Sequence, residues 1–136
     1  MKELFDVHCH MVPGVDDGAA DLEESLEMLK MQHEDGVRKI IITPHYRRRM
    51  FETPAKKVHE QFLKLQEAAK KEYPDMSLYL GCELHSNMDL QDILEKRKYV
   101  TMAGSSYVLL EFSEGDSAQH ILSLIHISEP TRHAQI

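Results

Sequence analysis

Short runs of apolar residues alternate along the chain with segments in which apolar residues recur at helical spacing. Runs at 4–7, 37–43, 76–80 and 107–112 are rich in aliphatic, β-branched or aromatic residues and predict strands. The isoleucines at 40–42 form a continuous apolar run, as expected for a strand that is covered on both faces. The first run is predicted to be a buried strand as well.

The segments between these strands carry the signals of helices. Asp21 is a predicted N-cap, and leucines repeat at helical spacing after it until Gly36 closes the segment. Thr53 and Pro54 predict the N-cap and the first turn of a second, longer amphipathic helix, and 89–96 predicts a short third one. The order β-α-β-α-β-(α)-β predicts an α/β fold with right-handed crossovers and a parallel sheet. Ligands of such folds gather at the carboxyl ends of the strands.

Composition and charge narrow the classes of function. The 136 residues include 23 acidic and 16 basic side chains, and the net charge of −7 repels phosphate backbones, so we expect no nucleic-acid partner. No apolar stretch is long enough to span a membrane, and the first residues lack the apolar region of a signal peptide, so we expect a soluble, cytoplasmic protein. Cys9 and Cys82 are too few for a disulfide scaffold and are expected to be free thiols.

The last segment of the chain needs a separate interpretation. Residues 122–132, LSLIHISEPTR, resemble the conceptual translation of a transposon-type sequencing adapter. On this interpretation the natural sequence stops near Ile121, so that residues 1–121 form a partial domain and residues 122–136 a non-native tail. The alternative is an ordinary apolar helix or strand at 117–127, which the local pattern also allows.

Residues of the kind that bind metals stand at or just beyond the ends of the predicted strands. His8 and His10 are spaced i, i+2, so on an extended backbone both rings can point to one side and share a cation. The further candidates are the Asp16-Asp17-Gly18 loop, His45, Glu83 and Glu111. Imidazoles and carboxylates together suit Mn, Fe or Zn better than Ca or Mg alone. Three histidines lack a carboxylate at ligand spacing and are predicted at the surface: His33, His59 and His85.

The sequence around these candidates resembles the PHP (polymerase and histidinol phosphatase) superfamily, and most of all its manganese-dependent protein-tyrosine phosphatases of bacterial capsule and exopolysaccharide systems. DVHCHMVPGVDDGA is similar to the opening motif of those enzymes, and TPH and GCE to the second and third, over about residues 3–113. The resemblance implies the N-terminal portion of a distorted, seven-stranded β/α barrel that uses three metal ions. The family's metal ligands fall on His8, His10, Asp17, His45, Glu83 and Glu111, with Glu83 as the bridge between two metals.

The later motifs of that family have no counterpart in this sequence. A histidine in a Pro-Glu-Arg context, a final Asp-x-His pair and the downstream arginines are missing, so the resemblance identifies no catalytic residue here. The mechanism it implies is hydrolysis of a phosphoester by a metal-activated water, with two to three Mn²⁺ ions, or with Fe or Zn. A cysteine phosphatase needs an arginine six positions after its cysteine, but Val15 and Met88 stand there after Cys9 and Cys82.

The substrate is predicted from the same resemblance and from a basic segment. Arg47 and Arg48, with Arg49, directly follow the predicted ligand His45 and its neighbour; they predict a basic lip that captures a phosphotyrosine phosphate or an acidic peptide, whereas the alternative is a solvated loop. The resemblance implies a phosphotyrosine protein as partner, such as a bacterial tyrosine kinase. Two other functions stay open. One is another PHP phosphoesterase of the histidinol-phosphate phosphatase type, against which GVDDGA and Glu111 argue; the other is an inactive truncated fragment.

Overall fold

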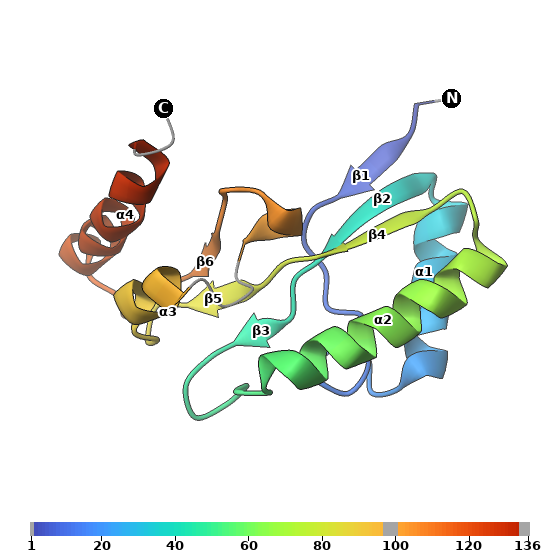
Figure 1. Cartoon of the computed structure of the whole chain (residues 1–136), viewed down its shortest axis with the longest axis horizontal. Coiled ribbons are helices and arrows are strands. Elements are labelled where there is room, and N and C mark those ends of the chain that lie inside the picture. Colours follow the sequence, from blue (N-terminus) through green and yellow to red (C-terminus); the bar gives the residue numbers. More distant parts are fainter. Residues whose placement is uncertain (1, 97–100, 134–136) are drawn as a thin grey trace.

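Strands from three distant parts of the chain pair side by side in the first of two small sheets. The computed structural model describes residues 2–96 and 101–133. Strands β1 (Leu4–Asp6), β2 (Val37–Ile42) and β4 (Ser77–Leu80) are parallel and stand in the order β1-β2-β4 (Figure 1). The parallel pairing predicted from the alternation of strands and helices is therefore confirmed.

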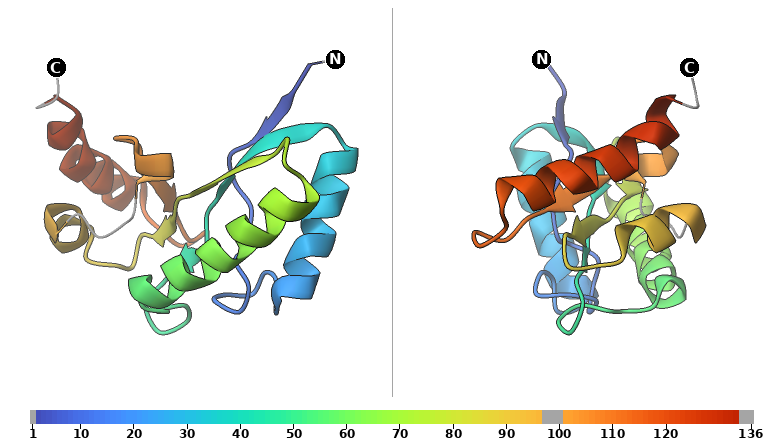
Figure 2. Two further views of the ribbon diagram at one scale, coloured as in Figure 1. Left: turned by 45° about the vertical axis from the view of Figure 1, so that its right-hand side comes forward. Right: turned by 90° about the vertical axis from the view of Figure 1, so that its left-hand side faces the viewer.

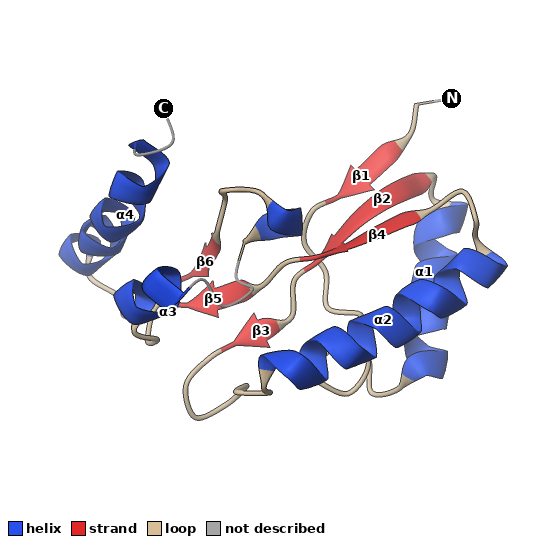
Figure 3. Ribbon diagram, in the orientation of Figure 1, coloured by secondary structure: helices blue, strands red, loops and turns tan. Residues whose placement is uncertain are grey.

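A second sheet of three short strands lies next to the first. Strands β3 (His45–Tyr46), β5 (Glu83–His85) and β6 (Leu109–Glu111) are also parallel, in the order β3-β5-β6 (Figure 3). The sequence pattern predicts a single sheet and the family resemblance implies a barrel. Among the described residues the strands instead form two open sheets, so the expectation of one continuous sheet is corrected.

The second sheet continues the strands of the first across a short break. Ile42 pairs with Leu80 in the first sheet and His45 pairs with Glu83 in the second, so the offset between partners is the same on both sides. Pro44 lies in the break, and the ladder stops there because its nitrogen has no hydrogen to donate. Its carbonyl still accepts a hydrogen bond from Glu83 N at 2.9 Å. The register of the first sheet is thereby passed on to the second.

Helix α1 (Leu22–Glu34) begins and ends where the sequence predicts. Asp21 is the N-cap, and its carboxylate accepts a hydrogen bond from Glu24 N at 2.9 Å, which satisfies one of the free N–H groups of the first turn. The helix ends before Gly36, whose φ of 92° lies in the left-handed region that glycine adopts without strain.

Helix α2 (Ala55–Glu72) differs from the prediction at its first turn. Pro54, rather than Thr53, occupies the N-cap position, and no side chain caps the helix. The Thr53 hydroxyl donates instead to the carbonyl oxygen of Val15 at 2.8 Å, because the loop before the helix crosses the loop that precedes α1. Helices α1 and α2 lie side by side on the same face of the β1-β2-β4 sheet (Figure 2).

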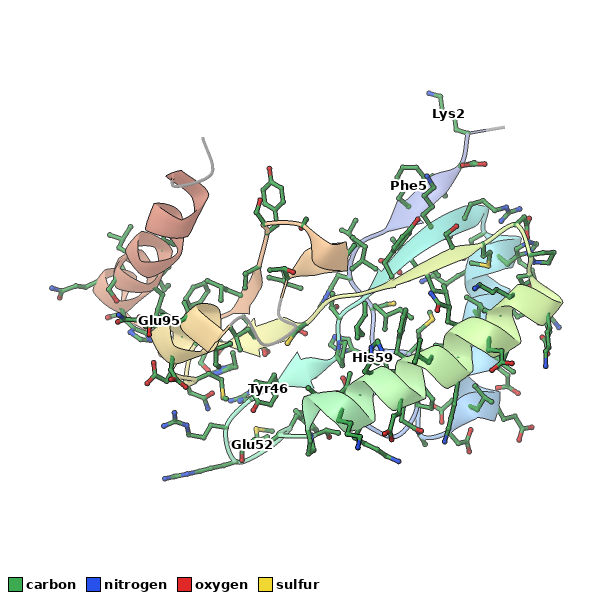
Figure 4. All side chains as sticks on the ribbon, viewed as in Figure 1. Lys2, Phe5, Tyr46, Glu52, His59 and Glu95 are labelled. Atoms are coloured by element: carbon green, nitrogen blue, oxygen red, sulfur yellow. The ribbon has the colours of Figure 1, made fainter. Side chains whose placement is uncertain are left out.

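The larger of two apolar cores lies between these helices and the first sheet. Its fully buried members include Met11, Leu29, Ile40, Ile42 and Leu65. The other face of the sheet is open: Phe5 is 62% and Val7 57% exposed (Figure 4). The prediction of a buried first strand is therefore wrong. Strand β1 is an edge strand, and α1 and α2 cover the opposite face of its sheet.

The smaller core joins the second sheet to the helices that follow it. Helix α3 (Leu90–Lys96) precedes a single turn of 3-10 helix (Met102–Gly104), and α4 (Ala118–His133) packs against α3. The buried residues of this core are Cys82, Leu84, Leu90, Ile93 and Leu124. No helix within the described residues is both long enough and apolar enough to cross a membrane.

Helix α4 runs through the position at which the sequence predicts a domain boundary. It includes residue 121 and continues beyond it, and Leu124 on its first turns is 6% exposed. A helix with a buried leucine does not reveal the origin of residues 122–136, so the tail stays a prediction. Its last residues, 134–136, lie outside the described part of the chain.

The loop between β1 and α1 folds back on itself at Gly18. Ala19 N donates to His10 O at 3.1 Å, and Gly14 N donates to Ala19 O at 2.9 Å. A Cβ atom at Gly18 would overlap the carbonyl oxygen of His10. Only glycine allows this close approach of the two backbone segments, and the approach holds the loop against the end of β1.

We expect Gly18→Ala to lower the free energy of unfolding by about 1–3 kcal/mol, because the loop backbone has to move to admit the methyl group. Gly115→Ala is the matched control, since a Cβ there meets no atom within 4 Å, and it should change stability by less than about 0.5 kcal/mol. Urea unfolding followed by circular dichroism measures both. Equal effects of the two substitutions would contradict the packing described for Gly18.

Candidate metal centre

The predicted ligands reach one place from separate segments of the chain. They lie after β1, in the loop before α1 and within the second sheet: His8, His10, Asp17, His45, Glu83 and Glu111. Strand register explains the convergence. His45 and Glu83 are cross-strand partners on neighbouring strands. On its other side Glu83 pairs with Leu109, two residues before Glu111, so the alternation of side chains puts both carboxylates on the same face.

The carboxylate of Glu83 stands in the middle of this group. Its Oε2 atom lies 3.1 Å from His10 Nε2, 3.3 Å from His45 Nδ1 and 3.7 Å from His8 Nε2. The Glu83 side chain is only 12% exposed. Three imidazole nitrogens therefore surround a carboxylate that is largely withdrawn from water.

His45 extends the cluster toward two further carboxylates. Its Nδ1 atom lies 3.4 Å from Glu111 Oε2, and its Nε2 atom lies 3.5 Å from Asp17 Oδ1. Three groups could each hold a metal ion, with ligand atoms within 4.8 Å of one another: His8, His10 and Glu83; His10, Asp17 and His45; and His45, Glu83 and Glu111. The groups share residues, so the six predicted side chains form one continuous cluster.

Buried polar atoms without a hydrogen-bond partner mark the middle of the cluster. Within the described part of the chain, they include His45 Nδ1, Glu83 Oε2 and Glu111 Oε2. An unpaired buried polar atom costs on the order of 1–3 kcal/mol. A divalent cation between these three atoms would satisfy all of them, and an imidazole with two carboxylates is a donor set that suits transition-metal ions. The residues present therefore fit a divalent metal ion.

Asp16 belongs to none of these groups but is bonded to two of their members. Its side chain is 0% exposed; Oδ1 accepts from Gly18 N at 2.9 Å, and Oδ2 accepts from His45 N at 3.0 Å and from His10 Nδ1 at 3.1 Å. Burial acts to raise the pKa of Asp16, but hydrogen bonds from His10 and the two amides outweigh it and lower the pKa. The hydrogen bond to Asp16 raises the pKa of His10, against the effect of burial.

Thr43 holds the His8 ring in a similar way. The Thr43 hydroxyl donates to Cys9 O at 3.3 Å, so the Nδ1–H of His8 is the donor in the 2.7 Å hydrogen bond to Thr43 Oγ1. With Nδ1 occupied on both rings, the Nε2 atoms of His8 and His10 face Glu83 with free lone pairs. Asp16 is a candidate from the sequence only as part of the 16–18 loop, and Thr43 is not a candidate. Their supporting roles were missed, and the signal for them was their position beside Asp17 and Pro44.

The two cysteines lie beside the cluster and are poor nucleophiles. Burial raises the pKa of Cys9 to about 12, and the charges of Asp6 and Asp16 act in the same direction. Burial likewise raises the pKa of Cys82 to about 12, with a further contribution from Glu83. Thiols with such pKa values stay protonated near neutral pH, which argues against thiolate chemistry.

The loop after β3 carries the predicted basic lip, Arg47–Arg49, beside the cluster. Arg47 N donates to Phe51 O at 2.8 Å, and the Phe51 ring stacks on the ring of His45 with centroids 5.1 Å apart. Arg47 is half-buried, and its Nε atom has no hydrogen-bond partner. Arg48 is exposed, and its backbone exchanges two hydrogen bonds with the Asn87 side chain, at 3.2 and 3.4 Å. The loop is thus fastened at its base and at its tip.

One of the three histidines predicted at the surface, His85, is corrected, whereas His33 is 27% exposed and forms a pair at the surface. His33 Nε2 lies 3.0 Å from both carboxylate oxygens of Asp75, a partner that is distant in the sequence, and this hydrogen bond lowers the pKa of Asp75. His85 is 4% exposed; its Nδ1 atom accepts a backbone N–H, so its Nε2–H donates to Ser113 Oγ at 2.9 Å. His59 is exposed, as predicted.

Known proteins are similar in sequence to this chain over most of its length. The model of the family described as capsular polysaccharide synthesis, CpsB/CapC, matches residues 4–129. Tyrosine-protein phosphatase CpsB from Streptococcus pneumoniae is 40% identical over 118 residues, which are 87% of this chain and 49% of that relative. Tyrosine-protein phosphatase YwqE from Bacillus subtilis is 31% identical over 109 residues, 80% of this chain and 43% of the relative. The chain spans about half the length of the curated relatives it matches.

A solved structure shares the fold as well. It comes from work on YwqE from Bacillus subtilis and CpsB from Streptococcus pneumoniae, described as unique metal-dependent tyrosine phosphatases. The TM-score is 0.83 at 28% sequence identity, over 93% of this chain and 51% of the solved one. These matches confirm the resemblance to the tyrosine phosphatases of capsule systems. The chain therefore belongs to the CpsB/CapC family of capsular polysaccharide synthesis.

Proposed function

We propose that this chain carries the metal-binding part of a protein-tyrosine phosphatase, a phosphoric monoester hydrolase that uses metal-activated water. The observation that carries the proposal is the convergence of three imidazoles and three carboxylates in one cluster, in which three of the ligand atoms are buried and lack hydrogen-bond partners. The relatives in the family, which are tyrosine-protein phosphatases by name, support the reaction class. Because the chain spans about half their length, the activity is proposed for the longer protein.

The proposed ligands of two to three divalent cations are His8, His10, Asp17, His45, Glu83 and Glu111. We propose Mn²⁺, with Fe or Zn as alternatives, since each suits imidazole and carboxylate donors. A bound cation of this kind lowers the pKa of water and neutralises charge on phosphoryl oxygens. Glu83 and His45, with side chains 12% and 14% exposed, form the closed side of the cluster. His8 and Asp17, at 45% and 63%, form the open side from which a phosphoester would approach.

The proposed substrate is a phosphotyrosine protein, and the proposed partner is a bacterial tyrosine kinase. Arg47 and Arg48 are assigned to substrate capture, because a guanidinium binds phosphate oxygens through paired N–H groups. The contact of Phe51 with His45 places their loop next to the cluster, and the contact of Asn87 with Arg48 holds its tip. A purely solvated loop is the alternative for these arginines.

The wider setting of the site is proposed in the same way. The two open sheets would be the N-terminal portion of a distorted, seven-stranded β/α barrel completed by further strands. A cytoplasmic location agrees with the two free cysteines, because reducing compartments keep thiols unpaired. Residues 122–136 remain a proposed non-native tail. The rival functions are a phosphoesterase of the histidinol-phosphate phosphatase type and an inactive fragment.

Activity should appear when the chain is joined to the C-terminal half of the pneumococcal relative. We expect that protein to hydrolyse a phosphotyrosine peptide faster than histidinol phosphate, and to lose turnover when Mn²⁺ is chelated. The 136-residue chain alone should show little or no turnover, because its cluster holds only part of the ligand set that the family resemblance implies. A preference for histidinol phosphate would favour the rival phosphoesterase, and equal turnover with and without the added half would refute the proposed incompleteness.

Replacing both Cys9 and Cys82 by serine should leave the phosphotyrosine turnover of the extended protein within about threefold of its starting value, since neither protonated thiol attacks phosphorus. Stopped assays with a phosphotyrosine peptide measure the effect, and bound Mn²⁺ and the circular dichroism spectrum verify that the variant is intact. Loss of turnover in an intact variant would support a thiol mechanism instead.

Glu83→Gln should reduce turnover in the extended protein far more than Arg48→Ala. A neutral amide offers one oxygen in place of a charged carboxylate, so it is a poor bridge between cations about 3.5–4 Å apart. Arg48→Ala should mainly raise KM, because its proposed role is capture of the substrate. Comparison of kcat and KM for both variants checks the assignment, and equal losses in kcat would contradict it.

A further inference from the structure

We propose that Asp16 is the positioning residue of the metal centre, because its one buried carboxylate sets the His10 ring, the His45 backbone and the loop that presents Asp17. This role rests on the proposed function and deepens it. Asp16 itself touches neither substrate nor metal in the proposal. It acts through the side chains and the backbone that it holds.

Within residues 2–96 and 101–133, every hydrogen bond of the Asp16 carboxylate goes to the ligand cluster or its loop. Oδ2 receives the His45 N–H at 3.0 Å and the His10 Nδ1–H at 3.1 Å, and Oδ1 receives the Gly18 N–H at 2.9 Å. Because the Asp16 side chain is 0% exposed, water does not compete for its carboxylate oxygens. The carboxylate has three donors and belongs to none of the three groups of candidate ligands.

The bond to His10 decides which nitrogen of that ring is free. A carboxylate only accepts, so His10 must carry its proton on Nδ1. The lone pair is then on Nε2, the atom that lies 3.1 Å from Glu83 Oε2. Outer carboxylates that orient metal-binding imidazoles in this way typically contribute about 10–100-fold to metal affinity.

The bond to Gly18 shapes the loop that carries Asp17. Accepting an N–H two residues ahead closes an Asx turn, which leaves the intervening Asp17 at the tip of the loop. The Asp17 side chain is 63% exposed and lies 3.5 Å from His45 Nε2. Two adjacent aspartates therefore have different roles, since one is buried as a support and the other is presented as a ligand.

Three variants of the 136-residue chain distinguish this positioning role from a merely structural one. Asp16→Ala removes all three acceptor contacts, Asp16→Asn keeps the shape but not the charge, and Asp35→Asn is a control at the exposed end of α1. Mn²⁺ titration by calorimetry gives affinity and stoichiometry. Nitrogen-15 NMR of the imidazoles in metal-free protein reports the His10 tautomer, and thermal unfolding reports stability.

We expect both Asp16 variants to bind Mn²⁺ at least about tenfold more weakly than the unmodified chain, with unchanged stoichiometry. The alanine variant should bind more weakly than the asparagine variant. In Asp16→Ala the Nδ1–H tautomer of His10 should no longer dominate, while Asp35→Asn should match the unmodified chain in every measurement. Should Asp16→Ala fail to fold, Asp16→Asn decides the affinity arm.

An unchanged His10 tautomer in folded Asp16→Ala would overturn the proposal, whatever happens to stability. Unchanged Mn²⁺ affinity in folded Asp16→Asn would overturn it as well. If neither the unmodified chain nor the protein extended with the C-terminal half of the pneumococcal relative binds Mn²⁺, the metal site of the proposed function fails, and the tautomer measurement alone decides whether Asp16 orients His10. The two ideas can therefore fail separately.

Discussion

The parallel pairing that runs from β2 into β3 and from β4 into β5 is the constraint on which the site depends. Its register survives the break at Pro44, so His45 arrives directly beside Glu83. A slip by one residue would turn one of these two side chains to the opposite face of the sheet. The buried isoleucines of β2 resist such a slip, because it would expose them to water. The packing of the apolar core thus determines which polar side chains lie beside each other in the cluster.

The cluster concentrates acceptor atoms that repel one another unless positive charge lies between them. His10 donates through Nδ1 to Asp16, so its Nε2 lone pair faces Glu83 Oε2 at 3.1 Å. Glu111 adds a second buried carboxylate oxygen without a hydrogen-bond partner. Two acceptors at this separation are stable only with a cation or a proton shared between them. The fold therefore favours positive charge within the cluster. Two buried side chains, Asp16 and Thr43, hold the imidazole rings whose free nitrogens would bind a cation there.

Local patterns predicted those parts of the molecule whose causes are local. The Asp21 cap and the Gly36 end of α1 depend on neighbouring residues, and both are where the sequence places them. The convergence of strand-end histidines and carboxylates also followed from general rules for parallel sheets. The exposure of β1, the second sheet and the burial of His85 did not follow, because they depend on which elements pack together. Asp16 could not be told from its neighbour by any local pattern, since both are aspartates in one glycine-bearing loop.

The open face of the first sheet has a consequence for how the protein behaves at high concentration. Phe5, Val7 and Tyr79 line part of a hollow of about 260 Å³ there, and no strand within residues 2–96 and 101–133 pairs with the outer edge of β1. An apolar face beside an unpaired strand edge is a template for contacts between molecules. Salts that strengthen burial, such as sulfate, would drive such contacts, and urea at low concentration would oppose them. The side of the sheet that faces away from α1 and α2 thus favours self-association of the chain.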